Sequence, residues 1–260
     1  MNFRFVGTGD SAQVPRFGCD CPACGRARVL SSHRRGACCA EVRVDGYRYL
    51  LDAGRTDLAD SCEQETPEAI LVTHYHADHV QGLFHLRWGT GTMIPVYGPK
   101  DANGCADLYR HPGVLDFRPG LKPFRPLMLP GLTVTPVPLN HSKPTLGFCL
   151  EDGGGRLAYL TDTLGLPGET ERFLRDWGPD VVVLDATHPS THHEPRNHNN
   201  LPMALQIIER LGASSAYLTH IGHDLDAECM TADMPLSGPV WLAHDGLELD
   251  AGAMMARRCG

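Results

Sequence analysis

The sequence has no long apolar run and no excess of positive charge. None of its apolar stretches approaches the eighteen or so residues that a membrane-spanning helix requires. Its 23 Lys and Arg residues against 31 Asp and Glu residues give a net charge of −8, which argues against the broad basic face of a nucleic-acid-binding protein. A small phosphorylated substrate is compatible with this charge, because bound metal ions can supply positive charge locally. We therefore expect no membrane partner and no nucleic-acid partner.

The sequence also lacks linker-like stretches and an N-terminal apolar segment. The first ten residues, MNFRFVGTGD, are too polar for a secretory signal. We therefore expect a cytoplasmic protein whose residues 1–260 form one domain. Ten cysteines are many for such a protein, and disulfides are uncommon in that compartment. Seven of them are scattered, and we expect these to be small buried apolar side chains: Cys38, Cys39, Cys62, Cys105, Cys149, Cys229 and Cys259.

The strongest signal in the chain is the stretch 73–79, which reads THYHADH. It follows the apolar run 69–72 directly and contains three imidazoles and a carboxylate. His74 and His76 alternate with other residues, so in an extended backbone both rings point the same way. Asp78 and His79 follow at an offset that can face a second ion beside the first. Because one metal ion takes three or four protein ligands, these candidates and others downstream indicate two ions.

Four later apolar runs also end in histidine or aspartate. Side chains at the carboxyl ends of adjacent strands converge on one edge of a sheet, where sites form in layered α/β folds. Four such runs are hard to attribute to chance. The residues that follow them are His141 (after 132–139), Asp162 (after 157–161), Asp185 (after 181–184) and His220 (after 216–219).

The rest of the chain alternates between strand and helix patterns. Residues 40–44 and 47–51 flank Asp45-Gly46, which is a strong signal for a β-hairpin. The second strand ends at Asp52, which could orient a metal-ligating histidine or simply cap a turn. Helices are expected at 101–109, 169–177 and 201–211.

A second group of candidate ligands lies near the N-terminus. Cys19, Cys21 and Cys24 follow the spacing C-x-C-x-x-C, which brings three thiolates close together. A redox pair would need only two cysteines, whereas three fit a tetrahedral structural zinc site that takes its fourth ligand from elsewhere. We propose His223, three residues after His220, as that fourth ligand. The expected zinc-binding loop therefore lies around 19–24.

The stretch THYHADH resembles the H-x-H-x-D-H signature of the metallo-β-lactamase superfamily. The resemblance implies an α/β fold, the αββα four-layer sandwich. Two ions about 3.5–4 Å apart can share a hydroxide nucleophile and stabilise charge on the oxygens of an in-line displacement. The superfamily's ligand pattern, carried over residue by residue, implies one ion bound by His74, His76 and His141, a second bound by Asp78, His79 and His220, and Asp162 bridging the two.

A narrower resemblance covers essentially the whole chain. The segments GCDCPAC, THYHADHVQG, LNHSK, LTDT, NHN and LTHIGH together resemble the phosphoribosyl cyclic phosphodiesterases of the carbon–phosphorus lyase pathway, by which bacteria extract phosphate from phosphonates. The resemblance implies hydrolysis of 5-phosphoribosyl 1,2-cyclic phosphate to ribose 1,5-bisphosphate. It also implies two Mn²⁺ ions in the active site (Zn²⁺, Fe²⁺ or Ni²⁺ being alternatives), one structural Zn²⁺ and a homodimer.

The same resemblance implies roles for individual side chains. His198 matches the family's candidate general acid, which would protonate the leaving oxygen after the metal-bridging hydroxide attacks phosphorus, and Asp78 is counted with it as catalytic. Lys143 could contact a substrate phosphate, although a solvated lysine fits the sequence equally well. Five arginines are further candidates that the sequence cannot rank: Arg16, Arg34, Arg35, Arg87 and Arg196. His188, His192 and His193 receive no role.

Two other families share part of this pattern. The tRNA 3′-processing endonucleases use the same ligand set, but they would need a protruding basic arm, and no such insertion is found here. The pyrroloquinoline-quinone biosynthesis B proteins share the C-x-C-x-x-C loop, but they tend to lack the full set of ligands for two ions. A β-lactamase is disfavoured because no export signal is evident.

Overall fold

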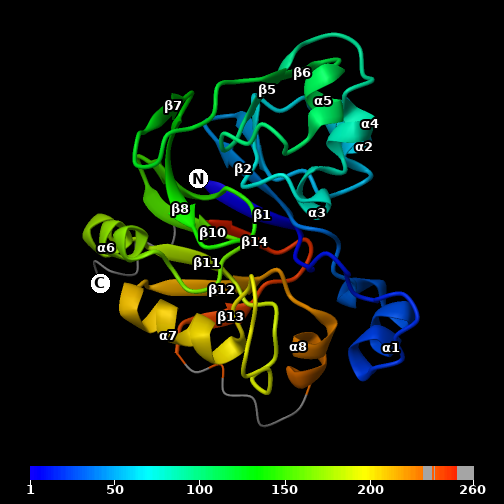
Figure 1. Cartoon of the computed structure of the whole chain (residues 1–260), viewed down its shortest axis with the longest axis vertical. Helices are drawn as coiled ribbons and strands as arrows, with labels where there is room; N and C mark the ends of the chain where they lie inside the picture. Colours follow the sequence, from blue (N-terminus) through cyan, green and yellow to red (C-terminus); the bar gives the residue numbers. More distant parts are fainter. Residues whose placement is uncertain (231–235, 237, 251–260) are drawn as a thin grey trace.

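The computed structural model describes residues 1–230, 236 and 238–250. Two seven-stranded sheets pack face to face, and helices cover their outer faces (Figure 1). The expected α/β sandwich of the metallo-β-lactamase type is therefore confirmed. Within the described residues, no helix is long and apolar enough to span a membrane.

The first sheet is built mainly from the N-terminal half of the chain. Its order is β14-β1-β2-β3-β4-β5-β6. The predicted hairpin is present, and positive φ angles at Asp45 and Gly46 (51° and 84°) form its tight turn. The strands are β1 (Asn2–Gly7), β2 (Cys39–Val44), β3 (Tyr47–Leu51), β4 (Ala69–Leu71), β5 (Ile94–Tyr97), β6 (Leu115–Phe117) and β14 (Glu248–Asp250).

Four short helices lie on the outer face of this sheet. Leu83 and Leu108, one from each of two of them, are buried against Ile70 and Val96. The helices are α2 (Leu58–Gln64), α3 (Ala77–Val80), α4 (Leu83–Leu86) and α5 (Ala106–Arg110). The helix expected at 101–109 was predicted wrongly, because it begins only at Ala106. The Asp101 carboxylate accepts a bond from Asn103 N, and Gly104 packs so closely on the Tyr75 ring that a Cβ would lie 2.6 Å from it.

The second sheet comes from the C-terminal half. Its order is β13-β12-β11-β10-β9-β8-β7, and its strands β10 to β13 run parallel. Parallel neighbours bring their carboxyl ends to the same edge. The strands are β7 (Leu127–Leu129), β8 (Leu132–Leu139), β9 (Thr145–Asp152), β10 (Gly155–Leu160), β11 (Val181–Asp185), β12 (Ser215–Thr219) and β13 (Val240–Leu242).

Helices α6 (Gly168–Trp177) and α7 (Leu201–Leu211) cover the outer face of the second sheet, as the sequence predicts (Figure 1). Helix α7 begins at Asn200, whose side chain accepts a bond from Met203 N. It ends at Gly212, which has a φ of 65°. These two caps define the ends of α7 at the residues that the sequence predicts, 201 and 211.

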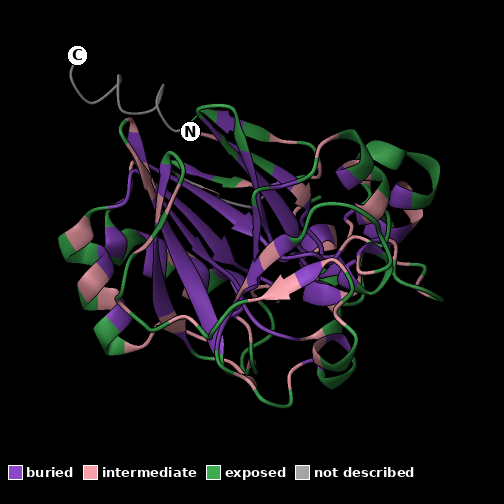
Figure 2. Cartoon of the chain, turned by 90° about the horizontal axis from the view of Figure 1, so that it is seen from above, coloured by how far each residue is buried: buried purple, intermediate pink, exposed green. Residues whose placement is uncertain are grey.

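The core between the two sheets is apolar and continuous. In Figure 2 the strands of both sheets are coloured mostly as buried, whereas the exposed residues lie in the loops and outer helices at the periphery. Phe3 and Phe5 of β1 meet edge to face at 4.9 Å, and Phe148 of β9 and Tyr159 of β10 close the core from the other sheet. This packing fixes the two sheets against each other, so the loops at their shared edge hold defined positions.

The N-terminal segment between β1 and β2 forms a small separate cluster. It contains α1 (Pro22–Val29) and the short 3₁₀ helix η1 (Ser31–His33). Helix α1 packs beside α8 (His223–Glu228), from the far end of the chain (Figure 1). Ala227 of α8 packs against a small buried group that includes Ala23 and Ala27 of α1.

Candidate dinuclear metal centre

The candidate metal-binding side chains meet at one edge of the sandwich. The THYHADH stretch begins in the loop after β4 and ends within α3, so the segment that follows β4 of the first sheet supplies four of them. His141, Asp162 and His220 follow β8, β10 and β12 of the second sheet. The structure thus brings together side chains that are up to 146 residues apart in sequence (His74 to His220, 220 − 74).

The first group consists of His74, His76 and His141. His76 Nδ1 lies 2.8 Å from His74 Nε2 and 3.0 Å from His141 Nε2. Three ring nitrogens therefore face one small volume, and His74 is fully buried. Three imidazoles at such distances are a suitable ligand set for a divalent transition-metal ion.

The second group consists of Asp78, His79, Asp162 and His220. Three of them are buried, and the side chain of Asp78 is 12 % exposed. His79 Nε2 lies 3.2 Å from Asp162 Oδ2 and 3.5 Å from Asp78 Oδ2. His220 Nε2 lies 3.4 Å and 3.3 Å from the same two oxygens. Within this group the ligand atoms all lie within 4.8 Å of one another.

Asp162 lies between the two groups. Its Oδ2 is 3.6 Å from His74 Nε2 and 3.8 Å from His141 Nε2, in addition to its approach to the second group. One carboxylate oxygen that faces nitrogens of both groups has the position that a bridging ligand requires.

The donor set fits divalent cations. His79 Nε2 is buried and has no hydrogen-bond partner, although an unpaired buried polar atom costs free energy. A cation in the second group would complete its coordination. Five imidazoles with two carboxylates suit Zn²⁺, Fe²⁺ or Mn²⁺ better than Mg²⁺ or Ca²⁺, which prefer oxygen ligands.

The other nitrogen of each ring is held by the surrounding protein. His79 Nδ1 donates to Asp52 Oδ2 at 2.9 Å, and Asp52 also accepts from Thr73 N at 2.8 Å. His141 Nδ1 donates to the Asn197 carbonyl at 3.1 Å. The sequence left open whether Asp52 orients a metal-ligating histidine or caps a turn, and the structure shows that it orients His79. Such contacts fix the tautomer and direction of a ligating ring.

His220 is held by a residue that the sequence gave no reason to choose. Its Nδ1 lies 2.9 Å from Thr187 Oγ1, and the same hydroxyl donates to the His220 carbonyl at 2.8 Å. Thr187 is nearly fully buried in the loop after β11. A threonine outside any ligand motif gives no signal of this contact, which depends on the pairing of β11 with β12.

The charges of the protein groups balance one another at this centre. Burial opposes the charged form of His220, but Asp162 and Asp78 outweigh burial and raise its pKa to about 10. Burial and the neighbouring His79 lower the pKa of His74 well below its usual range. Burial opposes ionisation of Asp162, yet His220 and His79 hold its pKa far below normal. The carboxylates are therefore ionised and available to cations at neutral pH.

His198 lies beside the second group. Its Nδ1 donates to Asp185 Oδ2 at 2.8 Å, and its ring stacks on His220 with centroids 4.8 Å apart. Burial disfavours the imidazolium, but the Asp185 carboxylate outweighs this effect and raises the pKa of His198. The side chain is 19 % exposed, so it borders both the buried ligands and the surface. Asp162, Asp185, His198 and His220 also form a group close enough to hold an ion.

The cysteines of the N-terminal loop meet His223 as proposed. His223 Nδ1 lies 3.5 Å from both Cys19 Sγ and Cys21 Sγ, and the four ligand atoms including Cys24 Sγ lie within 4.8 Å of one another. Three thiols and one imidazole are a donor set for tetrahedral zinc. Of the scattered cysteines, Cys229 is half-buried and Cys259 lies outside the described residues. The other five are buried as expected: Cys38, Cys39, Cys62, Cys105 and Cys149.

The candidate phosphate-binding residues can now be ranked in part. Arg35 is buried in an ion pair with Asp226 at 3.1 Å, and Arg87 is paired with Asp107 at 2.6 Å. Both therefore already have carboxylate partners. Lys143 lies two residues after His141, and its Nζ is 3.6 Å from Asp101 Oδ2, with 28 % of its side chain exposed.

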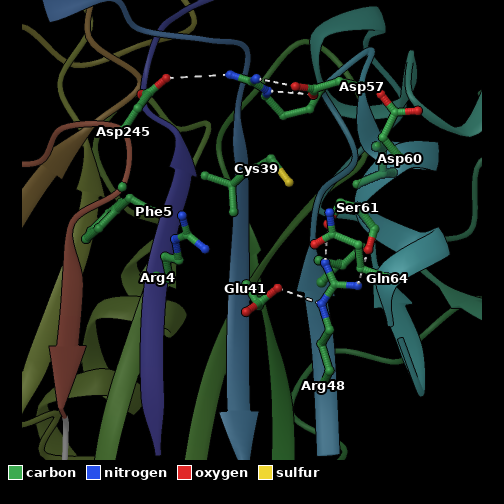
Figure 3. Close-up of a pocket in the computed structure, with 15 residues that line it drawn as sticks. Arg4, Phe5, Cys39, Glu41, Arg48, Asp57, Asp60, Ser61, Gln64 and Asp245 are labelled. Atoms are coloured by element: carbon green, nitrogen blue, oxygen red, sulfur yellow. Dashed lines mark hydrogen bonds and ion pairs between the residues drawn. The ribbon is translucent and has the colours of Figure 1, made fainter. Parts of the chain in front are cut away.

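A cavity of about 420 Å³ lies elsewhere, between the outer face of the first sheet and α2 (Figure 3). In its lining, Arg48 Nε of β3 donates to Glu41 Oε2 of the neighbouring β2 at 2.6 Å, and Arg55 pairs with Asp57 at 2.6 Å. Because these guanidinium groups already have carboxylate partners, we interpret the charges as structural. None of the metal-ligand candidates named above lines this cavity.

Comparison with known proteins agrees with this geometry. The family described as the beta-lactamase superfamily domain matches residues 47–221. A solved structure of a new diphosphatase from the PhnP family is 30% identical, with a TM-score of 0.79, over 96% of this chain and 97% of that one. The coenzyme PQQ synthesis protein B of Methylobacterium radiotolerans is 29% identical over 72% of this chain and 73% of its own length.

An octanoyltransferase of Porphyromonas gingivalis is 26% identical over 95% of this chain. That match covers 51% of the relative, so this chain spans about half of its length.

Proposed function

This chain belongs to the metallo-β-lactamase superfamily and, within it, to the PhnP family, and we propose that it is a metal-dependent hydrolase of a small cyclic phosphodiester. The first candidate substrate is 5-phosphoribosyl 1,2-cyclic phosphate, which would be opened to ribose 1,5-bisphosphate in phosphonate catabolism. The protein would act as a homodimer.

One observation carries the proposal. Seven potential ligands lie in two groups around Asp162, and His198, which belongs to neither group, stacks on His220 beside them. A hydrolase for a phosphodiester needs ions to balance the charge of the phosphoryl oxygens and a donor for the leaving oxygen. This arrangement offers both within one edge of the sandwich.

Bound ions and protein side chains have separate roles in the proposed reaction. When bound, divalent ions supply Lewis acidity toward the phosphoryl oxygens and lower the pKa of water. Water attacks phosphorus, the bond from phosphorus to the leaving oxygen breaks, and that oxygen takes a proton from His198 Nε2. The attacking water loses a proton to solvent as its oxygen bonds to phosphorus, and His198 takes up a proton from solvent before the next turnover. Asp185 holds His198 Nδ1–H, so Nε2 is the nitrogen that faces the substrate.

Lys143 and the two kinds of metal complete the proposal. Lys143, held near Asp101, would contact a phosphate oxygen at the side of His141. The proposed active-site ions are two Mn²⁺, and the soft Cys19, Cys21, Cys24 and His223 set would hold one structural Zn²⁺.

A second candidate activity is hydrolysis of a diphosphate bond. The PhnP-family structure that matches nearly the whole chain is that of a diphosphatase. The same ligands would serve, since the attacked atom is again phosphorus and the leaving group is a phosphate. A diphosphate substrate would need less protonation of its leaving oxygen than a cyclic ribosyl phosphate, because phosphate is the weaker base.

A substrate panel with Mn²⁺-loaded protein tests the proposal. It should contain bis-p-nitrophenyl phosphate, 2′,3′-cyclic nucleotides, 5-phosphoribosyl 1,2-cyclic phosphate and ADP-ribose as a diphosphate diester. We expect the highest kcat/KM for the ribosyl cyclic phosphate. A higher value for ADP-ribose would select the diphosphatase, and turnover of none of the four would refute phosphodiester chemistry. Size-exclusion chromatography of the same preparation tests the dimer.

A further inference from the structure

We propose that Tyr159 is a positioning residue for the metal centre, which acts through Asp52 on His79 and couples the two sheets at the site. The proposal rests on the proposed function only in that the centre binds divalent ions. It is independent of which phosphate ester is the substrate.

Asp52 is the point on which the contacts converge. Its side chain is fully buried at the end of β3. Oδ1 accepts from Thr73 N at 2.8 Å and from Thr73 Oγ1 at 3.0 Å, whereas Oδ2 accepts from His79 Nδ1 at 2.9 Å. A buried carboxylate must be surrounded by donors, since water cannot replace them. The position of Asp52 therefore decides the direction of the His79 ring.

Tyr159 supplies a donor to Asp52 from the opposite sheet. Its hydroxyl lies 3.4 Å from Asp52 Oδ2 and 3.1 Å from Cys38 Sγ, and its side chain is 1 % exposed. Cys38 Sγ is itself 4.0 Å from Asp52 Oδ2. The phenol and the thiol thus lie beside Oδ2, the oxygen that also accepts from His79 Nδ1 and, at 3.0 Å, from Thr73 Oγ1.

The strand that carries Tyr159 also carries Asp162. Tyr159 belongs to β10 and is paired in register with Phe148 of β9 and Val183 of β11, so its height along the sheet is fixed. Asp162 follows three residues later, and its Oδ2 lies 3.2 Å from His79 Nε2. The end of β10 therefore positions both nitrogens of the His79 ring. Asp162 contacts Nε2 directly, and Tyr159 acts on Nδ1 through Asp52.

This arrangement has a consequence for metal binding. His79 comes from the first sheet, whereas Asp162 and His220 in the same group come from the second. A link between the sheets behind His79 keeps the three ligands at a constant separation. Without the phenol, Asp52 and the ring can shift together, and the group is less well organised before an ion enters.

Tyr159→Phe tests the proposal, with Tyr49→Phe as the matched control. Tyr49 is also fully buried in the core between the sheets, and its hydroxyl donates to the Pro130 carbonyl at 2.7 Å, away from the metal centre. The readouts are the Mn²⁺ concentration at half-saturation in the absence of substrate and the visible spectrum of the Co²⁺-loaded protein.

We expect Tyr159→Phe to raise the half-saturating Mn²⁺ concentration about 10-fold, the lower end of the range for residues that support a ligand. It should also change the Co²⁺ spectrum, whereas Tyr49→Phe should leave both unchanged. Equal behaviour of the two variants would overturn the proposal, because Tyr159 would then be only a packing residue.

A double-mutant cycle tests whether Tyr159 acts through Asp52. Asp52→Asn should weaken Mn²⁺ binding about 10–100-fold, and adding Tyr159→Phe should weaken it little further. If the double variant weakens Mn²⁺ binding by the product of the two single-variant factors, Tyr159 acts by a route other than Asp52, and the proposal is overturned. If Asp52→Asn does not fold, the comparison of Tyr159→Phe with Tyr49→Phe decides alone. Failure of the substrate panel would leave these binding results unaffected, so the two proposals can fail separately.

Discussion

The two groups of metal-ligand side chains are built in opposite ways. The centre around Asp162 takes its members from the ends of four strands in two sheets, and most of them are buried. The cysteine group takes three of its four members from six consecutive residues, and Cys19 and Cys21 are half-exposed. The centre around Asp162 is positioned by the fold, whereas the cysteine group joins a short loop to α8.

This difference predicts different responses to the loss of one ligand. The histidine and aspartate side chains at the sheet edge are held by their own strands and by partners such as Asp52, Thr187 and Asn197. Removing an ion there should cost function more than stability. The cysteine loop contains little apolar core of its own, so removing its ion should cost stability more than function.

The largest effect is expected for Asp162→Ala. Asp162 Oδ2 faces nitrogens of both groups, and its negative charge screens two cations that would lie close together. We expect turnover to fall to the background rate and metal content at this centre to fall with it, while the fold persists. Elemental analysis and circular dichroism are the measurements. Full occupancy by two ions in the variant would refute the bridging role.

The sequence was sufficient to predict which side chains meet at this edge, because each of them lies in a segment that follows an apolar run. His220 directly follows β12, whereas His141 and Asp162 lie two residues after the last residues of β8 and β10. Strands of this kind are recognised without tertiary information. The fold class followed from the resemblance of the THYHADH motif to the metallo-β-lactamase superfamily signature. A side chain at the end of a buried strand thus carries its own positional signal.

The supporting residues could not be predicted in this way. Thr187 and Tyr159 are ordinary members of a loop and a strand, and their contacts exist only because of which strands pair and which sheets face each other. The missing first half of the helix expected at 101–109 has a similar cause, since Gly104 packs on a distant ring, Tyr75. Helical propensity does not register such a contact.

A smaller loss of turnover is expected for His198→Ala, which separates proton donation from metal binding. His198 lies outside the two groups proposed to hold ions, so both ions should stay bound. Loss of a general acid costs on the order of 10²–10⁴ in rate. The loss should be smaller for bis-p-nitrophenyl phosphate, whose leaving group needs little protonation, than for a cyclic ribosyl phosphate, which expels an alkoxide.

His192→Ala is the matched control for this experiment. His192 is an exposed histidine of the same loop, and its ring stacks on His188 with centroids 4.4 Å apart. The His192→Ala substitution should leave the turnover of bis-p-nitrophenyl phosphate and of the cyclic ribosyl phosphate unchanged. Equal losses on the two substrates in His198→Ala would mean that His198 positions the phosphate instead of donating a proton, and loss of metal would make it a ligand.

The smallest effect on turnover, with the clearest effect on stability, is expected for Cys21→Ser. A serine hydroxyl is a poor zinc ligand, so the loop should lose its ion and with it at least about 2 kcal/mol, or about 4–8 °C in Tm for a chain of this size. Cys229 is a half-buried cysteine of the same α1–α8 region but outside the cysteine group, so Cys229→Ser should lower stability less and keep zinc.

In the parent protein zinc should resist mild chelation that removes the Asp162-centred ions, because a closed thiolate site holds zinc more tightly than an open histidine and carboxylate site. The surviving fraction of Cys21→Ser should turn over substrate at close to the parent rate, since His220 is also held by Thr187. Zinc-free parent protein that is folded and active would eliminate the structural site, and a loss of turnover larger than the loss of folded protein would show that the two metal groups are coupled through the segment 220–223.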